Sequence, residues 1–200
     1  MSESDVVLNT ETQITDQVIA DIQKMVERSV EVPLKRQWHS ETSLDSVRHW
    51  AWGIGDDNPL WSEPAYGSGT AHGTTLMPPS FFYSCNQGPN GFRSEPSRGE
   101  GLPGLHAIWA WDRWEWPSPV KRNTQVNTTK QTTEANIRPS KFGGDRAVEV
   151  VTRYTFRDDD DNLLATYDVA YMHFGRDIAA KKGSKGKSLE RQVWTDEMLE

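Results

Sequence analysis

The pattern of apolar and polar positions divides the chain into helices followed by strands. The first apolar series, in residues 15–28, has the spacing of one helical face and comprises Val18, Ile19, Ile22, Met25 and Val26. Thr15 is placed to cap this helix, and Ile14 with Ile19 to form a hydrophobic staple. The sequence therefore predicts an N-terminal helix that packs on the rest of the fold through one face.

Two further helices are predicted on either side of a long loop. A helix is expected over residues 43–52, with Thr42 and Asp45 placed like a capping box. Residues 55–77 contain breakers throughout and are expected to form a loop, namely Pro59, Pro64, Gly67, Gly69 and Gly73. Residues 78–85, PPSFFYSC, begin with prolines suited to a first helical turn and continue with bulky apolar residues. This pattern predicts a short buried helix.

The second half of the chain has the alternation of strands. Strands are expected at 105–116, 123–137, 146–156 and 163–174, and the last is apolar on both faces, as in a central strand. The acidic run 158–162 between the last two indicates a hairpin turn. Helices followed by at least four antiparallel strands, with no alternation of strand and helix, indicate an α+β domain.

Composition and charge narrow the class of protein. The 200 residues, 35% of them hydrophobic, suit one globular domain, or one domain with extensions. Residues 1–14 are expected to be a flexible N-terminus and residues 177–200 a charged, mobile tail. A net charge of −7 argues against nucleic acid or an anionic membrane as the main partner, because both require a dominant basic face. Neither a signal peptide nor an apolar run of roughly 20 residues is present, so a cytoplasmic location is expected.

Metal and redox chemistry are not expected. The single cysteine, Cys85, cannot form an internal disulfide and is interpreted as a small core residue. No cluster of His, Cys and carboxylates has the spacing of metal ligands, and the glycines of the 55–77 loop do not form a phosphate loop. Nine tryptophans provide either a large core or the walls of a wide apolar pocket.

The stretch GDDNPLWSEPAY, residues 55–66, carries candidate chemistry. Addition of water to an enoyl thioester needs a base for the water, an acid for the α-carbon and donors for the developing enolate oxygen. Asp56 can act on the water, Asn58 can orient Asp56, and the start of the 78–85 helix can supply the donors. An imidazole that could share the proton transfer is not available in this stretch.

Two stretches resemble a known family. SLDSVRHWAWGIGDDNPLWSEPAY, residues 43–66, and HGTTLMPPSFF, residues 72–82, resemble the MaoC-like dehydratases. They are most similar to the N-terminal-type domain, which is similar to the dehydratase part of fungal fatty acid synthases, and WEWPSPV at 114–120 fits the strand entry of that domain. The resemblance covers about residues 15–176. It implies a hot-dog fold, in which an antiparallel sheet wraps around the 78–85 helix and the N-terminal helix is an extension.

The resemblance also implies a substrate and an assembly. Such domains pair side by side, and acyl thioesters of coenzyme A bind at the seam as substrates, with no further cofactor. The pattern G-D-x-N-P-L-H of active members, with an acidic residue after one more position, is matched at six positions: Gly55, Asp56, Asn58, Pro59, Leu60 and Glu63. Trp61 stands where the pattern has histidine, and Lys121 with Arg122 stand where the family often has Gly and Asp in a turn. Tryptophan cannot exchange a proton near neutral pH, and the loss of general acid–base help costs about 10²–10⁴-fold in rate.

Site residues follow from the loop and from the resemblance together. Catalytic roles are assigned to Asp56, Asn58 and His72, the last because it lies on the same long loop shortly before the helix. Substrate binding is assigned to Trp61, Pro79, Ser80, Phe81 and Trp114. No metal ligand is assigned.

Three functions stay open at the level of sequence. In the first, the chain is the degenerate half of a heteromeric enoyl-CoA hydratase whose MaoC-like hot-dog partner supplies the full Asp and His pair. In the second, a self-sufficient hydratase or dehydratase, with a second copy of itself as partner, uses Asp56 and another proton carrier. In the third, the chain is a non-catalytic thioester-binding subunit. A thioesterase has less support, because the 78–85 helix offers no carboxylate.

Overall fold

The computed structural model describes residues 13–34, 37–86, 105–140 and 145–175. Most of the predicted flexible N-terminus and the whole predicted tail lie outside these residues. In chain order the elements are α1 (Asp16–Glu27), β1 (Val32–Pro33), α2 (Leu44–Gly53), α3 (Pro59–Ser62), α4 (Pro64–Ser68), the 3₁₀ turn η1 (Pro79–Phe81), α5 (Phe82–Cys85), β2 (Leu105–Glu115), β3 (Asn127–Ser140), β4 (Asp145–Arg157) and β5 (Leu163–Gly175). None of the described helices is long and apolar enough to span a membrane.

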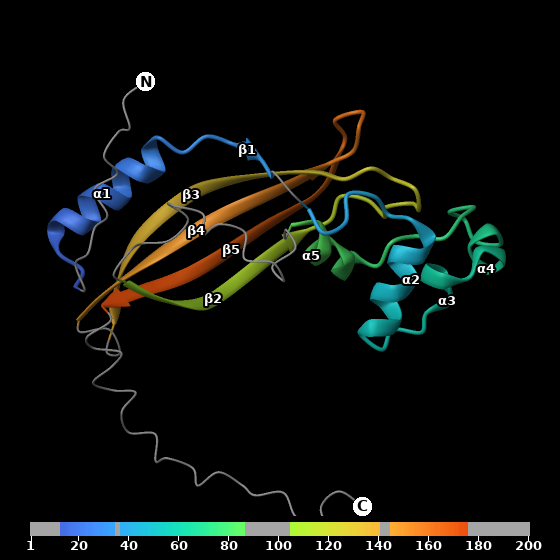
Figure 1. Ribbon diagram of the computed structural model, residues 1–200, viewed down its shortest axis with the longest axis horizontal. Helices are drawn as coiled ribbons and strands as arrows, with labels where there is room; N and C mark the ends of the chain where they lie inside the picture. The colour runs from blue at the N-terminus through green and yellow to red at the C-terminus, as the bar shows by residue number, and fades with distance from the viewer. Residues whose placement is uncertain (1–12, 35–36, 87–104, 141–144, 176–200) are drawn as a thin grey trace, which may run out of the picture.

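One antiparallel sheet of five strands organises the molecule, in the order β1-β3-β4-β5-β2. Helix α1 lies at one end of the sheet, and α2, α3 and α4 gather at the other (Figure 1). The four predicted strands are confirmed, although β3 begins at Asn127 instead of residue 123. The sequence missed β1, because a strand of two residues that contains Pro33 has no readable alternation. The predicted α+β class is confirmed.

Helices α1 and α5 cover two halves of the same sheet face. Phe82 of α5 packs on Phe156 of β4, with ring centroids 4.8 Å apart. Val18 of α1 belongs to a second buried cluster with Val148 and Val150 of β4. Residues 148, 150 and 156 are separated by even numbers of positions along one strand, so their side chains lie on the same face. The sheet therefore wraps around α5 as expected, and the N-terminal helix shares that face.

The predicted helices are confirmed with two corrections. The N-cap of α1 is Thr15, as expected, and its hydroxyl accepts from the Val18 N–H at 3.3 Å. The N-cap of α2 is Ser43 instead of Thr42, because Thr42 is buried and its hydroxyl bonds the 121–124 turn. The 55–77 segment is not all loop: α3 and α4 each begin at a proline, which suits the first helical position as well as it breaks a helix interior.

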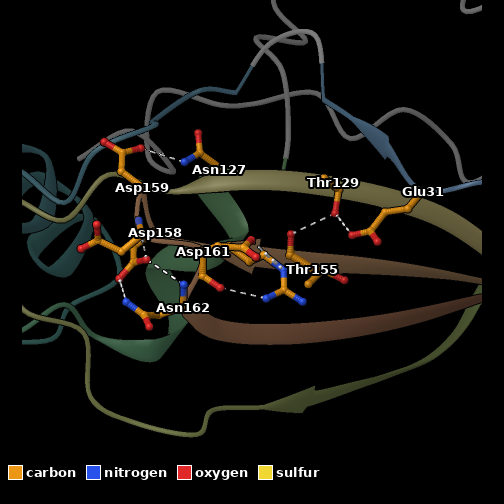
Figure 2. A network of polar contacts seen from close by, with 10 residues as sticks. Glu31, Asn127, Thr129, Thr155, Asp158, Asp159, Asp161 and Asn162 are labelled. Carbon is orange, nitrogen blue, oxygen red and sulfur yellow. Dashed lines mark hydrogen bonds and ion pairs between the residues drawn. The ribbon is translucent and has the colours of Figure 1, made fainter.

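The β4–β5 hairpin closes through the predicted acidic turn, shown in Figure 2. Oδ1 of Asp158 accepts from the N–H groups of Asp160 and Asn162, at 3.0 and 2.8 Å. The Asn162 side chain donates to the other oxygen at 2.9 Å and is the main cause that lowers the pKa of Asp158. Asp161 adopts a left-handed φ of 63°. The turn therefore satisfies its own polar groups through its side chains.

Candidate active site

Asp56 is positioned by the way in which α2 ends. Gly55 has a φ of 76°, and its N–H donates to the Trp52 carbonyl at 3.1 Å. The N–H of Asp56 reaches back to the Ala51 carbonyl at 2.8 Å. These two bonds form a Schellman motif, in which a left-handed residue, usually glycine, follows the helix. The glycine of the motif therefore fixes the backbone of the aspartate that follows it.

Asp56, Asn58 and Trp61 form one hydrogen-bonded unit. Oδ1 of Asp56 accepts from the Asn58 N–H at 3.1 Å, and Oδ1 of Asn58 caps α3 by accepting from the Leu60 N–H at 3.0 Å. Nε1 of Trp61 donates to Oδ2 of Asp56 at 2.8 Å. Each oxygen of Asp56 therefore holds an N–H group from within its own loop, and the indole occupies the position that the pattern gives to histidine.

The motif loop and α2 each contact the segment that leads into the central helix. The N–H of Leu76 donates to the Leu60 carbonyl at 3.1 Å. Nε1 of Trp50 donates to the Ser80 hydroxyl at 3.0 Å, and its ring meets the buried Phe81 edge to face at 6.0 Å. Pro79 is exposed at the first position of η1. These contacts join residues between 16 and 31 positions apart near the start of one helix.

Trp114 lies against the central helix in an aromatic wall that it forms with Tyr83 and Tyr167. It stacks on Tyr167 with ring centroids 4.1 Å apart, and its Nε1 donates to the Tyr83 oxygen at 3.0 Å. The Tyr83 hydroxyl donates to Oδ2 of Asp112 at 2.6 Å. Burial is the main cause that raises the pKa of Tyr83, and the hydrogen bond to Asp112 raises it further.

Sequence reasoning missed Tyr83 and Asp112. The positions of Asp112 and Trp114, two apart on β2, already indicate a shared face. Nothing in the sequence indicates that Tyr83 of α5 meets them, because this contact spans 29 residues.

The structure brings together two of the three residues assigned to catalysis. His72 lies exposed in the turn after α4, where its backbone N–H donates to the Thr70 hydroxyl at 3.3 Å. Among the described contacts, none joins its imidazole to Asp56 or Asn58. A catalytic role for His72 stays a prediction.

Cys85 and the described side chains of types that bind metals complete the description of this region. Cys85 is fully buried in α5, and burial raises the pKa of its thiol to about 12. Such a thiol is protonated and unreactive near neutral pH. Within the described residues, no three His, Cys, Asp or Glu side chains lie close enough to hold a metal ion.

Comparison with known families and structures identifies relatives of this arrangement. The family described as "FAS1-like, dehydratase domain region" matches residues 28–166. A comparison with curated proteins gives no match. The solved ChsH1-ChsH2 complex from Mycobacterium tuberculosis is similar with a TM-score of 0.62 and 15% identity, over 78% of this chain and 93% of that chain.

A second solved structure, described as a MaoC-like dehydratase, is similar with a TM-score of 0.56 and 13% identity. The match covers 82% of this chain and 49% of that chain, so this chain spans about half of that protein. The structural similarity establishes the hot-dog fold. At sequence identities this low, it does not by itself show that this chain has the activity of either protein. The expected fold and the resemblance to MaoC-like dehydratases are confirmed.

Proposed function

Because the chain belongs to the family of FAS1-like dehydratase domain regions, we propose that it is the degenerate half of a heteromeric enoyl-CoA hydratase. It shapes one side of an acyl-thioester site. A MaoC-like partner chain with the complete G-D-x-N-P-L-H pattern supplies the Asp and His that move protons. The observation that carries this proposal is the 2.8 Å hydrogen bond from the Trp61 indole to Asp56.

The hydrogen bond from Trp61 to Asp56 is typical of a loop that keeps its structure but does not catalyse proton transfer. Hydration needs one group that takes a proton from water as its oxygen adds to the β-carbon, and another that returns a proton to the α-carbon. In the hot-dog hydratase pattern an imidazole would exchange protons beside Asp56. The indole N–H of Trp61 can only donate a hydrogen bond, and it occupies one oxygen of that carboxylate. The Asn58 N–H occupies the other oxygen.

The same chain retains features suited to binding a thioester. The N–H of Ser80 lies at the second position of η1, where backbone donors have no partner within the helix. Such a donor can hold the oxygen of a thioester as negative charge develops on it. The partly buried aromatic wall around Trp114 offers apolar surface next to the central helix for the acyl group.

The edge strand β2 supports a partner chain. It is 11 residues long, lies at one edge of the sheet, and exposes Ile108 and Trp109. A long apolar edge strand presents unpaired backbone groups together with hydrophobic side chains, and proteins usually cover such edges. One of the structures with this fold is a complex, ChsH1-ChsH2, so the fold occurs in assemblies of two named chains.

The test is the loss of conjugated-thioester absorbance from a panel of enoyl-CoA substrates. The purified chain is expected to give no turnover. A MaoC-like chain with the complete pattern, added to the same cuvette, is expected to give turnover that depends on both chains. In this mixture Asp56→Asn of the present chain should leave the rate within about twofold, because the partner moves the protons.

Two results would contradict the proposal. Turnover by the purified chain, lost in Asp56→Asn, would show a self-sufficient hydratase. Equal turnover by the partner with and without this chain would show that the chain does not contribute to the site.

A further inference from the structure

A tight turn between residues 121 and 124 is held by buried Thr42. The Thr42 hydroxyl donates to the Lys121 carbonyl at 2.9 Å and accepts from the Thr124 N–H at 2.9 Å. Its backbone carbonyl accepts from the Asn123 N–H at 2.9 Å, and Asn123 has a left-handed φ of 58°. Side-chain-bearing residues adopt this conformation rarely, and it persists where the surroundings enforce it. The turn is therefore fixed before any ligand arrives.

The turn presents two cationic side chains that have no carboxylate partner among the described residues. Lys121 and Arg122 are exposed, and neither forms an ion pair with another described residue. By contrast, most of the described arginines pair with a carboxylate: Arg48, Arg113, Arg138, Arg146, Arg153 and Arg157. In a chain with a net charge of −7, two adjacent cations that pair with no described carboxylate form a local positive site.

This positive site borders the proposed thioester site. The Arg122 N–H donates to the Thr75 carbonyl at 3.2 Å, and Lys121 lies opposite Leu76 in an antiparallel bridge. Leu76 is the residue whose N–H bonds the carbonyl of Leu60 in the motif loop. The segment 75–77 therefore lies between the cationic turn on one side and the Asp56 loop on the other, and it leads directly into η1.

We propose that Lys121 and Arg122 bind the phosphate groups of the coenzyme A part of the thioester. The inference rests on the proposed function, since it takes the thioester to lie at the start of η1. Arginine can hold a phosphate through two parallel N–H bonds, and lysine adds a point charge. Neither Gly nor Asp, the residues of the family pattern at these positions, offers such a contact.

The separation between the two sites suits this ligand. From Leu76, opposite Lys121, to Ser80 there are four residues, which span at most about 14 Å when extended. The phosphates of coenzyme A are joined to the thioester by the long pantetheine arm. The phosphates therefore need cations at some distance from Asp56, and the 121–124 turn lies across segment 75–77 from the Asp56 loop.

The experiment is calorimetric titration of the full chain, in the assembly in which it purifies, with octanoyl-CoA and with octanoyl-pantetheine, which lacks the phosphates. The double variant Lys121→Gln/Arg122→Gln should bind octanoyl-CoA about tenfold more weakly, because two charge-assisted contacts at an exposed site are lost. Its affinity for octanoyl-pantetheine should not change. The matched control is Lys24→Gln/Arg28→Gln, which removes the same charge from the C-terminal end of α1 and should bind both ligands as the wild type does.

Ionic strength gives a second, independent measure. Added salt should weaken octanoyl-CoA binding by the wild type and have a smaller effect on the double variant, because exposed charge pairs are screened. Arg122→Lys should keep more affinity than Arg122→Gln, since one cation is retained.

The outcomes separate this inference from the proposed function. Unchanged affinity of the double variant for octanoyl-CoA would overturn the inference and leave the proposed function intact. An equal loss for both ligands would also overturn it, because the turn would then support the fold of the site and not the phosphates. If the wild type bound neither ligand even with the MaoC-like partner chain present, the proposed function would fail, and the inference with it.

Discussion

The indole nitrogen of Trp61 lies 2.8 Å from Oδ2 of Asp56, so the residue that replaces the expected histidine is bonded to the carboxylate that a histidine would assist. The bond connects Asp56, two residues after the C-cap of α2, to α3. The N-cap of α3, Asn58, donates its backbone N–H to the other oxygen of Asp56. The indole at this position thus donates a hydrogen bond to Asp56 but cannot exchange a proton near neutral pH.

Trp61→His is expected to create weak hydratase activity in the isolated chain. An imidazole at this position could exchange protons beside Asp56, and general acid–base help contributes about 10²-fold at the low end. The measurement is the rate of absorbance loss with an enoyl-CoA substrate. Trp61→Phe is the control, because it removes the indole N–H without adding an imidazole, and Trp61→His/Asp56→Asn should lose the gain. A gain of the same size in Trp61→Phe would show that the indole only blocked access.

The part of the site that is local in sequence could be predicted. Asp56 and Asn58 lie two residues apart, and their roles depend on a helix end and a cap, both of which have short sequence signals. The cap of α2 was assigned one residue too early because Thr42 and Ser43 are both good capping residues. Their different roles depend on the 121–124 turn, which lies about 80 positions away.

The strands were predicted better than the segment before the central helix. β4 and β5 carry regular alternation, which reflects one buried face directly. The prolines at 59 and 64 were interpreted only as helix breakers, yet both start short helices that are held by packing against the loop. The contact between Tyr83 and Asp112 joins different elements, and no local pattern encodes it.

Gly67→Ala should strongly destabilise the fold around α4. A Cβ at Gly67 would lie 2.4 Å from the Thr75 nitrogen and 2.6 Å from the Thr74 carbonyl carbon, and both atoms are backbone that cannot rotate away. Overpacking of this kind costs about 2–3 kcal/mol of unfolding free energy. Gly69→Ala, two residues on, would meet its nearest atom at 3.5 Å and should change stability by less than about 0.5 kcal/mol. Urea denaturation of both variants checks the difference, and equal midpoints would contradict it.

Tyr83→Phe should loosen the contact between α5 and β2. The Tyr83 hydroxyl accepts from Trp114 at 3.0 Å and donates to Asp112 at 2.6 Å, so its removal leaves two partly buried partners without a hydrogen bond. The expected loss is about 1–2 kcal/mol of unfolding free energy, measured by urea denaturation followed through tryptophan fluorescence. Tyr154→Phe is the control, because the Tyr154 hydroxyl forms no hydrogen bond with the described residues. This variant should lose less than about 0.5 kcal/mol of unfolding free energy. Similar losses in the two variants would show that the hydroxyl network contributes little.

The ion pairs of Asp168 should make stability fall on acidification. Asp168 is buried and accepts hydrogen bonds from Nε of Arg153 at 2.7 Å and from Nη2 of Arg113 at 2.6 Å. The bond from Arg153 is the main cause that lowers the pKa of the Asp168 carboxyl, and the bond from Arg113 lowers it further. A carboxyl whose folded pKa lies below its unfolded value of about 3.9 stabilises the fold at higher pH. This contribution is lost as pH falls through the unfolded pKa towards the folded one.

Asp168→Asn tests this sign directly. The variant should be less stable than the wild type near neutral pH by about 2 kcal/mol, because two guanidinium groups lose their anion. The difference should narrow as pH falls below about 4, where the wild-type carboxylate takes up its proton. Part of the acid sensitivity should persist in the variant, since the Trp111 N–H and Arg138 lower the pKa of Glu149 as well. If instead the difference in unfolding free energy between the two proteins stayed constant from neutral to acid pH, Asp168 would have the same pKa in the folded and the unfolded chain.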